Sequence, residues 1–573
     1  MNIQQQLEAA VTSAIEELGA EGPAIVKQAA RPEFGHYQAN GIMGAAKRAG
    51  KKPRDLAAGV VDKLTLPNAE PLEIAGPGFI NIRLSDAFIG ESLAAIAADD
   101  RLGVGRETPE TIVVDYSAPN LAKEMHIGHL RSTTIGDASV RIFEFLGHNV
   151  IRANHVGDWG AQFGSLLAYM EQMSNEAVLD TELRDLENFY KAASALFRTD
   201  EAFAKRAREF VVRLQSGDPR CLELWQRFID ESIRHCQAVY EALNITLKRS
   251  DISPESAYNH DLPLVVTELT ERGLLTESMG AMCVFLPGFT GKDDKPLPAI
   301  IRKSDGGYPY MATDLAAIRH RTGVLQADRA CYFVGAPQTL HLKQLFAVAE
   351  AANYLPPDHR FVHYPFGSVL DPDTGKMFKT RDGADVKLAD VLAEAVTRAQ
   401  RLVDKKSSGL SDDERAEVAR CVGVGAVKYA ELSKNRVTDY SFAWDTMLSF
   451  EGDTAPYLQY AYTRIRSVFR RAGVDPDQPS DEIAVSEPAE RVLGVKLLQF
   501  EEAILAVVDD CQANILCQYL YELAGNFMTF YEACPILNAE DTVRKSRLGL
   551  AALTARTLGT GLGLLGIETV EQM

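Results

Sequence analysis

The sequence predicts an α/β protein whose central part is a doubly wound parallel sheet, with a smaller α/β module before it and an all-α domain after it. Three observations lead to this prediction. The 573 residues exceed what one hydrophobic core organises, residues 111–160 alternate strand, helix and strand, and the pattern after about residue 400 is almost wholly helical. We therefore expect domains at 1–106, 107–400 and 401–573.

The first domain opens with a helix and closes with a strand. Leu7, Val11 and Ile15 recur at the spacing of one helix face. EIAGPGFINIRL follows at 73–84, where glycine and proline break the chain before an alternating strand. Phe79 and Asn81 occupy alternate positions and therefore share one face of that strand.

The second domain contains the strand and helix alternation of a parallel sheet. TIVVDYS at 111–117 is the apolar, β-branched run of a buried strand. A helix is expected from Met125 to Leu146, with Gly147 as its stop, and VIRANHVGDWG supplies the next strand and a glycine-rich turn. Residues from about 165 to 300 are predicted to be a mostly helical insertion, after which AIIRKSDGGYPYMATDLAAI resumes the alternation. Ligands of such sheets bind at the carboxyl ends of the strands.

Composition limits the classes of function. A formal charge of −19 argues against generic nucleic-acid binding, because nonspecific affinity comes from Lys and Arg that neutralise phosphates. We expect no DNA partner, and an RNA partner requires a local basic surface. No apolar run is long enough to cross a membrane and the first residues lack the features of a signal peptide, so we expect a cytoplasmic protein without a membrane partner. The eight cysteines contain no C-x-x-C pair and are predicted to be buried thiols, which leaves no protein-bound metal expected.

Two histidines around a glycine stand where the first strand of the sheet passes into its helix. His126, Gly128 and His129 lie in SAPNLAKEMHIGHLRSTTIGD. Imidazoles at a helix start can donate hydrogen bonds to phosphates, and a bare glycine lets a nucleotide base approach the backbone. An isolated H-x-G-H is weak evidence, since two surface histidines give the same pattern.

A second phosphate-binding candidate lies about 250 residues further on. LDPDTGKMFKTRDG places Lys376 and Lys379 in a loop rich in glycine and aspartate. Mobile lysines can stabilise charge on the β and γ phosphates during adenylyl transfer. The same loop is equally compatible with two solvated lysines that have no role.

Taken together, the two stretches resemble the HIGH and KMSKS signatures of class I aminoacyl-tRNA synthetases, in the same order and on either side of an insertion. Phe378 and Thr380 replace the two serines of KMSKS, although both lysines are retained. The pattern P-N-x-A-K-x-x-H-x-G-H, which includes Lys123, resembles the arginyl family in particular. The resemblance runs from FGHYQAN near the start to the terminal GIETVEQM and implies a Rossmann-like catalytic domain.

The resemblance implies which residues line the amino-acid pocket. Arginine presents a planar cation with five donors and requires acidic partners. The family's pocket positions match Asp115, Asn120, Tyr310, Asp314 and Gln338. We expect the carboxylates at the guanidinium and the two amides at the amino or carboxylate end, whereas N-capping is the structural alternative for either aspartate.

HVGDWGAQFG at 155–164 is a further arginyl-like signature. Gly157 and Gly160 in it suit a tight turn against the adenylate. Trp159 is expected to pack against other side chains, whereas Gln162 is compatible both with a site contact and with a bond to the backbone.

The resemblance also implies tRNA contacts at both ends of the chain. Tyr457 and Tyr460 lie one turn apart with Arg464 four residues on, a pattern that is otherwise more typical of a core. The family's motif here opens the anticodon-binding domain, and Arg466, Arg470 and Arg471 are expected to supply local basic charge. Tyr531 and Met573 are further candidate contacts. In the first domain, Phe79 and Asn81 match positions that contact the tRNA D-loop; the alternative places Phe79 in the core and Asn81 at a sheet edge.

The function implied is ATP-dependent activation of L-arginine, with Mg²⁺ bound to the ATP, followed by transfer to the 3′ end of tRNA(Arg). The family's behaviour further implies that activation requires bound tRNA, and we expect a monomer. Three alternatives differ in sequence features. A small-molecule nucleotidyltransferase needs no long helical domain, a cysteinyl synthetase carries zinc ligands near its pocket, and a noncatalytic RNA-binding paralogue is expected to have damaged phosphate motifs.

Overall fold

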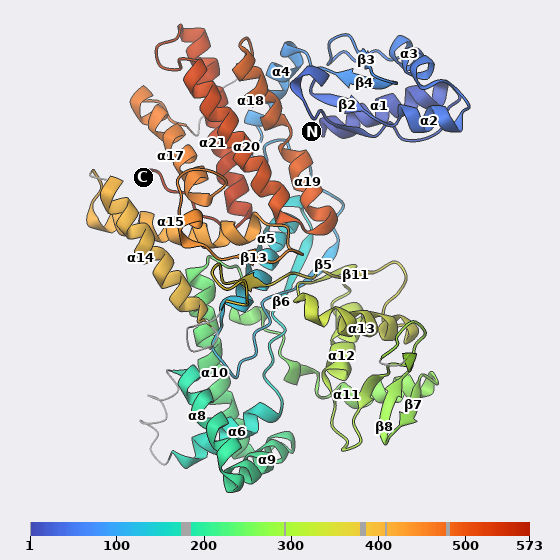
Figure 1. The fold of residues 1–573 in the computed structure, drawn as a ribbon, viewed down its shortest axis with the longest axis vertical. Coiled ribbons are helices and arrows are strands. Elements are labelled where there is room, and N and C mark those ends of the chain that lie inside the picture. The colour runs from blue at the N-terminus through green and yellow to red at the C-terminus, as the bar shows by residue number, and fades with distance from the viewer. Residues whose placement is uncertain (1, 174–184, 292–293, 379–385, 407–408, 477–481) are drawn as a thin grey trace.

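The computed structural model describes the chain except for residues 1, 174–184, 292–293, 379–385, 407–408 and 477–481. Figure 1 shows a small N-terminal module at the upper right, a stack of helices beside it, a central sheet, and two lobes below the sheet. No helix in the described ranges is both long and apolar enough to cross a membrane.

The N-terminal module is a four-stranded antiparallel sheet covered by helices. Its strand order is β1-β2-β4-β3. Leu7, Val11 and Ile15 are buried on the first helix, which confirms the helical spacing. β4 pairs on both sides, so the alternative that placed Asn81 at a sheet edge is wrong. The elements are α1 Ile3–Glu17, β1 Val26–Gln28, β2 Tyr37–Ala39, α2 Ile42–Arg48, α3 Pro53–Lys63, β3 Glu73–Ala75, β4 Phe79–Ile82 and α4 Asp86–Ala97.

The central sheet is parallel, in the order β11-β10-β5-β6. Because β6 follows β5 on one side and β10 lies on the other, the chain reverses direction across the sheet between β5 and β10, where doubly wound folds bind ligands. Ile112 and Val114 pack into one core and Val113 into the other, so both faces are covered. The elements are β5 Thr111–Asp115, α5 Leu130–Leu146, β6 Asn149–Ala153, β10 Arg329–Tyr332, α13 Thr339–Ala351 and β11 Arg360–His363.

The helix after β5 begins later than the sequence suggested. A 3₁₀ turn, η2 Ile127–His129, precedes α5, because His126 has extended backbone (φ −117°, ψ 172°) and caps that turn with its side chain. The expected stop is confirmed, since Gly147 ends α5 in the left-handed conformation at φ 98°.

The insertion is helical only in its first part. Its helices are α6 Ala161–Gln172, α8 Leu186–Thr199, α9 Glu201–Gln215, α10 Pro219–Ala242 and α11 Leu262–Glu271. A separate antiparallel sheet follows, built from β7 Leu275–Ser278, β8 Ala281–Val284 and β9 Ala299–Arg302. The strand in AIIRK therefore does not rejoin the parallel sheet as expected, because it pairs with its sequence neighbour β8. Ala299 and Ile301 of this strand, together with the helix after it, α12 Tyr310–Gly323, pack into the core on one face of the central sheet.

The C-terminal part is helical, as predicted, apart from a two-residue strand pair between β12 Val369–Leu370 and β13 Tyr440–Ser441. Its helices share one core with the N-terminal module and one face of the central sheet. All eight cysteines are buried and free, which confirms the prediction of buried thiols. The helices are α14 Leu388–Lys406, α15 Asp412–Leu432, α16 Trp444–Met447, α17 Ala455–Ala472, α18 Pro488–Leu498, α19 Phe500–Asp510, α20 Ala513–Ala533 and α21 Asp541–Leu564.

Candidate active site

A pocket of about 310 Å³ opens at the carboxyl ends of β5 and β10. Asp115 ends β5, Tyr310 and Asp314 lie one turn apart at the start of α12, and Gln338 ends the 3₁₀ turn η6 Ala336–Gln338. These four residues, which the sequence pointed to from three distant segments, all line this one pocket. Asn120 is not among its lining residues. The Asn120 side-chain oxygen instead accepts hydrogen bonds from the Ala122 backbone (3.0 Å) and the Gln162 amide (3.1 Å).

The Asp314 carboxylate is held between two imidazoles. His341 Nε2 lies 2.6 Å from Asp314 Oδ2, and His155 Nε2 lies 3.5 Å from Oδ1. Burial raises the pKa of Asp314, but the hydrogen bonds and positive charge from the two histidines outweigh it and lower the pKa to about 2. Asp314 therefore keeps its negative charge at any pH in the physiological range.

The Asp115 carboxylate has a partner within the chain. Arg321 Nη2 donates to Asp115 Oδ2 at 2.6 Å, and both side chains are buried. The Arg321 guanidinium also lies 4.8 Å from the centre of the Tyr332 ring. Burial opposes the charge of Arg321, yet the nearby Tyr332 and Asp115 raise its pKa above the usual value. A guanidinium is thus already bound to one of the two predicted carboxylates.

Besides Arg321 and Tyr332, sequence reasoning missed a glutamate and two histidines that line the pocket. Glu255, from the 3₁₀ turn η4 Glu255–Tyr258, lines the pocket, and burial raises its pKa to about 7. His155 and His341 hold Asp314. His155 opens the HVGDWG signature and was therefore detectable, whereas Glu255 and His341 stand in segments without a motif.

The histidine motif forms a reciprocal cap. His126 Nδ1 accepts from the Gly128 backbone and His129 Nδ1 accepts from the His126 backbone, each at 3.1 Å. Accepting at Nδ1 places the proton of a neutral His126 ring on Nε2, the donor that a phosphate requires, whereas His129 Nδ1 also lies 3.3 Å from the His126 carbonyl oxygen. A Cβ atom added to Gly128 would lie 2.8 Å from His126 Cε1, so the ring position requires glycine. At Gly157 an added Cβ would meet only ordinary contacts with Asn120, the nearest at 3.6 Å.

The lysine loop ends against the histidine motif. The Ile127 backbone donates to Val386 O (2.9 Å) and the Leu388 backbone donates to Met125 O (3.0 Å), so the segment that follows the loop pairs with the segment that contains His126. At the other end of the loop, the centre of the Phe378 ring lies 5.3 Å from that of Phe442. The phenylalanine that replaces the first serine of KMSKS therefore packs against another aromatic side chain.

The three lysines of the predicted phosphate site lie in different surroundings. Lys376 lies exposed in the turn after β12. Lys379 and Thr380 lie outside the described residues. Lys123 points to the insertion, with Nζ 4.7 Å from the Tyr190 ring of α8.

The pocket and the histidine motif are adjacent. Thr133 Oγ1 lies 2.9 Å from Ser117 Oγ and 2.7 Å from His129 O, so one side chain bridges the end of β5 and the motif. Trp159 packs edge-on against Trp225, which confirms its packing role.

Comparisons with known proteins agree with this geometry. Residues 92–444 match the model of the class I tRNA synthetase (R) catalytic domain, residues 458–573 the DALR anticodon-binding domain, and residues 1–84 the arginyl-tRNA synthetase N-terminal domain. The chain is 55% identical to an arginine–tRNA ligase of Hahella chejuensis over the full length of both proteins. The chain belongs to the arginyl-tRNA synthetase family. Solved arginyl-tRNA synthetases from Plasmodium falciparum and Thermus thermophilus superpose with TM-scores of 0.87 and 0.84 at 28% and 26% identity, each covering all of this chain and 99% and 100% of the other.

In this arginyl-tRNA synthetase chain, the predicted tRNA residues of the helical domain divide into two groups. Arg464 lies over the rings of Tyr460 and Tyr531, with its guanidinium carbon 5.9 and 4.9 Å from their centres, and Tyr460 is 41% exposed. Tyr457 packs against Tyr521 instead. Of the residues predicted as one stripe on α17, Tyr460 and Arg464 therefore form a tyrosine–arginine–tyrosine stack with Tyr531 of α20.

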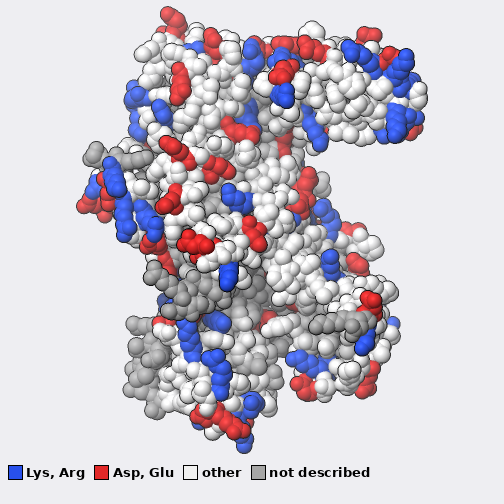
Figure 2. Space-filling view, in the orientation of Figure 1, with Lys and Arg blue, Asp and Glu red and all other residues white. Residues whose placement is uncertain are grey.

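The arginines of the expected basic patch form hydrogen bonds with other residues of the helical domain. Arg466 Nε and Arg470 Nη1 bind Glu571 at 2.7 and 2.8 Å, and Arg471 Nη2 donates to Tyr531 Oη at 3.0 Å. Figure 2 shows acidic and basic side chains intermixed over the visible face, without one continuous basic band. Arg466 and Arg470 therefore anchor the C-terminal tail, and the terminal Met573 packs against the core.

In the N-terminal module of this arginyl-tRNA synthetase chain, the two candidate tRNA contacts differ in exposure. Phe79 is half-buried, whereas Asn81 is only 7% exposed. The Asn81 side-chain oxygen accepts a hydrogen bond from Gln38 Nε2 at 2.7 Å. Phe79 is thus the more accessible of the two.

Proposed function

We propose that this chain activates L-arginine with ATP and transfers the arginyl group from the adenylate to the 3′ end of tRNA(Arg). The observation that carries the proposal is the charge of the pocket. Its lining includes three carboxylates, from Asp115, Glu255 and Asp314, together with the guanidinium of Arg321 and the imidazoles of His155 and His341. Carboxylates are the partners that a ligand with a cationic side chain requires, and the pocket opens beside a motif suited to phosphates.

The carboxylates have separate roles in the proposed arginine site. Asp314, which stays ionised, and Glu255, which approaches ionisation near neutral pH, bind the substrate guanidinium. Asp115 uses one oxygen for Arg321 and thereby helps to fix the wall of the pocket. Tyr310, whose side chain is largely exposed at the mouth, covers the guanidinium plane. Asn120 and Gln338 bind the amino and carboxylate end.

The chemistry proposed has two steps. A carboxylate oxygen of arginine attacks the α-phosphorus of ATP, the bond to the β-phosphate oxygen breaks, and pyrophosphate leaves. His126, His129, Lys123, Lys376 and Lys379 stabilise the phosphate charge, with Gly128 and Gly157 next to the nucleotide, while Mg²⁺ arrives bound to the ATP phosphates. The ribose hydroxyl at the 3′ end of the tRNA then attacks the arginyl carbonyl and AMP leaves. Positioning and electrostatic stabilisation supply the acceleration.

The partners proposed are tRNA(Arg), arginine and ATP, in a cytoplasmic monomer. The Tyr460–Arg464–Tyr531 stack receives an unpaired base, because aromatic faces and arginine bind single-stranded bases. Tyr457 and Met573 are further proposed tRNA contacts. Phe79 and Asn81 receive the D-loop. Activation of arginine requires bound tRNA.

The test is an aminoacylation assay across the twenty amino acids with bulk tRNA and ATP. Arginine alone should be charged, and Asp314→Asn should raise the KM for arginine while ATP binding persists. Asp261→Asn is the matched control, since Asp261 pairs with Arg319 outside the pocket. An unchanged KM for arginine in Asp314→Asn would remove the pocket assignment, and failure to charge any tRNA with arginine would remove the function.

A further inference from the structure

A strained turn forms part of the wall of the proposed arginine site. Ser117 and Ala118 follow β5, and Ala118 lines the pocket. Both residues have left-handed backbone, at φ 67° and 43°, which L side chains rarely adopt. Such a conformation persists only where the surrounding structure holds it in place.

The Tyr240 hydroxyl contacts one residue of the turn directly and the other through Asn154. Its oxygen lies 2.8 Å from Ser117 Oγ and accepts from Asn154 Nδ2 at 3.1 Å. Asn154 Oδ1 in turn accepts from the Ala118 backbone at 3.0 Å. Tyr240 is buried near the end of α10, in the insertion. The hydroxyl therefore links the insertion to Ser117 directly and to Ala118 through Asn154. Ser117 is also held from α5, because its backbone donates to Ser132 Oγ at 2.9 Å and Thr133 Oγ1 donates to Ser117 Oγ at 2.9 Å.

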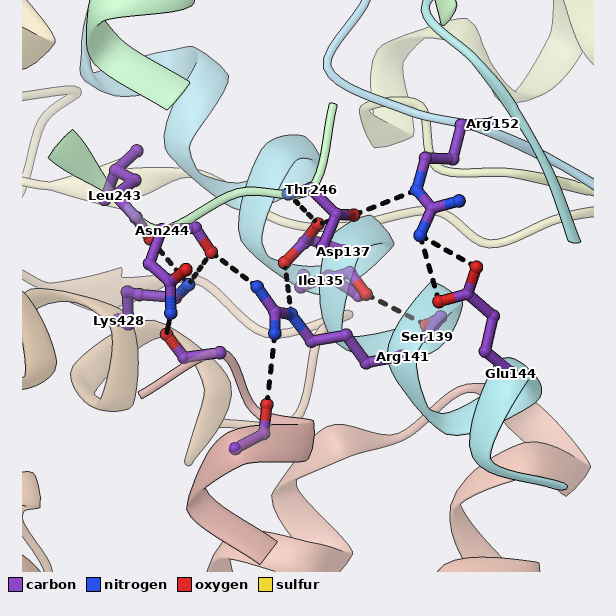
Figure 3. Close-up of polar contacts among 12 residues, drawn as sticks. Ile135, Asp137, Ser139, Arg141, Glu144, Arg152, Leu243, Asn244, Thr246 and Lys428 are labelled. Atoms are coloured by element: carbon purple, nitrogen blue, oxygen red, sulfur yellow. Dashed lines mark hydrogen bonds and ion pairs between the residues drawn. The ribbon is translucent and has the colours of Figure 1, made fainter. Parts of the chain in front are cut away.

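The end of α10 is fixed by a lysine from the helical C-terminal part. Lys428 of α15 is fully buried, and its Nζ donates to the carbonyl oxygens of Leu243 (2.7 Å) and Asn244 (3.4 Å). Arg141 of α5 adds a bond to the Asn244 carbonyl at 2.7 Å (Figure 3). The last carbonyls of a helix have no partner within it and carry partial negative charge, so a cation here stabilises the helix end.

We propose that Tyr240 is a positioning residue for the arginine site and that Lys428 acts through it, by fixing the last turn of α10. Only two residues separate Tyr240 from Leu243, so a shift of the helix end moves the hydroxyl that supports Ser117 and Ala118. The consequence is that a buried lysine of the helical C-terminal part controls how well the pocket wall fits arginine. The inference rests on the proposed arginine site and adds two residues that do not touch the substrate.

The experiment measures steady-state aminoacylation of the full chain at saturating tRNA, with KM for arginine, KM for ATP and kcat as separate readouts. Tyr240→Phe removes only the hydroxyl, and Lys428→Met removes only the cation. Loss of a buried hydrogen bond leaves its partners unsatisfied, so each variant should raise the KM for arginine on the order of tenfold. The KM for ATP and kcat should stay within about twofold. The double variant should raise the KM no further than the larger single effect.

Arg556→Met is the matched control, because Arg556 also donates to two backbone carbonyls across a domain boundary, those of Ala97 and Asp99. It should leave all three constants unchanged. An unchanged KM for arginine in Tyr240→Phe overturns the proposal. Equal changes in both KM values, or additive effects in the double variant, overturn the role of Lys428. Asp314→Asn measured alongside separates these outcomes from failure of the pocket assignment itself.

Discussion

At the scale of single residues, the two aspartates of the pocket differ in what neutralises them. Asp115 is paired with Arg321, while Asp314 is bound by the imidazoles of His155 and His341. Both are short acidic residues at element ends, and no sequence pattern distinguishes them. The difference depends on Arg321, which lies on α12 about 200 residues after Asp115 and joins it only through the fold.

Arg321→Met should strongly destabilise the chain, because it leaves the Asp115 carboxylate buried without its partner. The expected loss is about 3–5 kcal/mol in the free energy of unfolding of the catalytic part, measured by chemical denaturation. Arg319→Met, on the same helix, removes partly exposed pairs with Asp261 and Glu268 and should cost about 1 kcal/mol or less. Equal losses in the two variants would mean that the buried pair has no special role.

The pH dependence of arginine binding should follow Glu255. Burial raises the pKa of Glu255 to about 7, so the side chain is mostly neutral at pH 6 and mostly negative at pH 8. The substrate guanidinium stays positive across this range. The KM for arginine should therefore fall as the pH rises from about 6 to 8. Glu255→Gln should flatten most of that slope, and a variant with the wild-type profile would exclude Glu255 as its origin.

At the scale of elements, the histidine motif caps the 3₁₀ turn η2 at the start of α5, and we propose that the same turn binds phosphate. Gly128→Ala places a Cβ within 2.8 Å of the His126 ring and must displace it. We expect kcat to fall tenfold or more, since roughly 1.4 kcal/mol of lost transition-state stabilisation suffices, while the KM for arginine changes little. Gly525→Ala, at a helical glycine with open space around it, is the control. A kcat equal to wild type would show that the ring position is not needed.

Local patterns predicted the elements that local physics determines. Helical spacing identified α1, and β-branched residues identified β5. Gly147 identified the end of α5, because glycine readily adopts the left-handed backbone found there. The partner of a strand is not a local property: AIIRK has the composition of a sheet strand, and nothing in it distinguishes pairing with β8 from pairing in the central sheet. Glu255 and Arg321 were missed for the same reason, since the fold alone brings them to the pocket.

At the scale of the whole molecule, the proposed arginine pocket and the proposed base-binding stack lie in different parts of the fold. The pocket is at the central sheet, whereas Arg464 lies on α17 in the helical stack. Any effect of Arg464 on arginine chemistry must therefore pass through bound tRNA or through the protein between the two places. The continuous hydrophobic core that joins the helical part to one face of the sheet provides the protein route.

Exchange of labelled pyrophosphate into ATP separates these two routes. Wild-type exchange should be absent without tRNA and should appear as tRNA is added. Arg464→Ala removes a guanidinium that proposed base stacking requires, so it should raise the tRNA concentration needed for half-maximal exchange about tenfold. The plateau at saturating tRNA should match wild type, because the pocket is untouched. A lower plateau would show that Arg464 acts on the pocket through the protein, and full exchange without tRNA would show that arginine activation does not require tRNA.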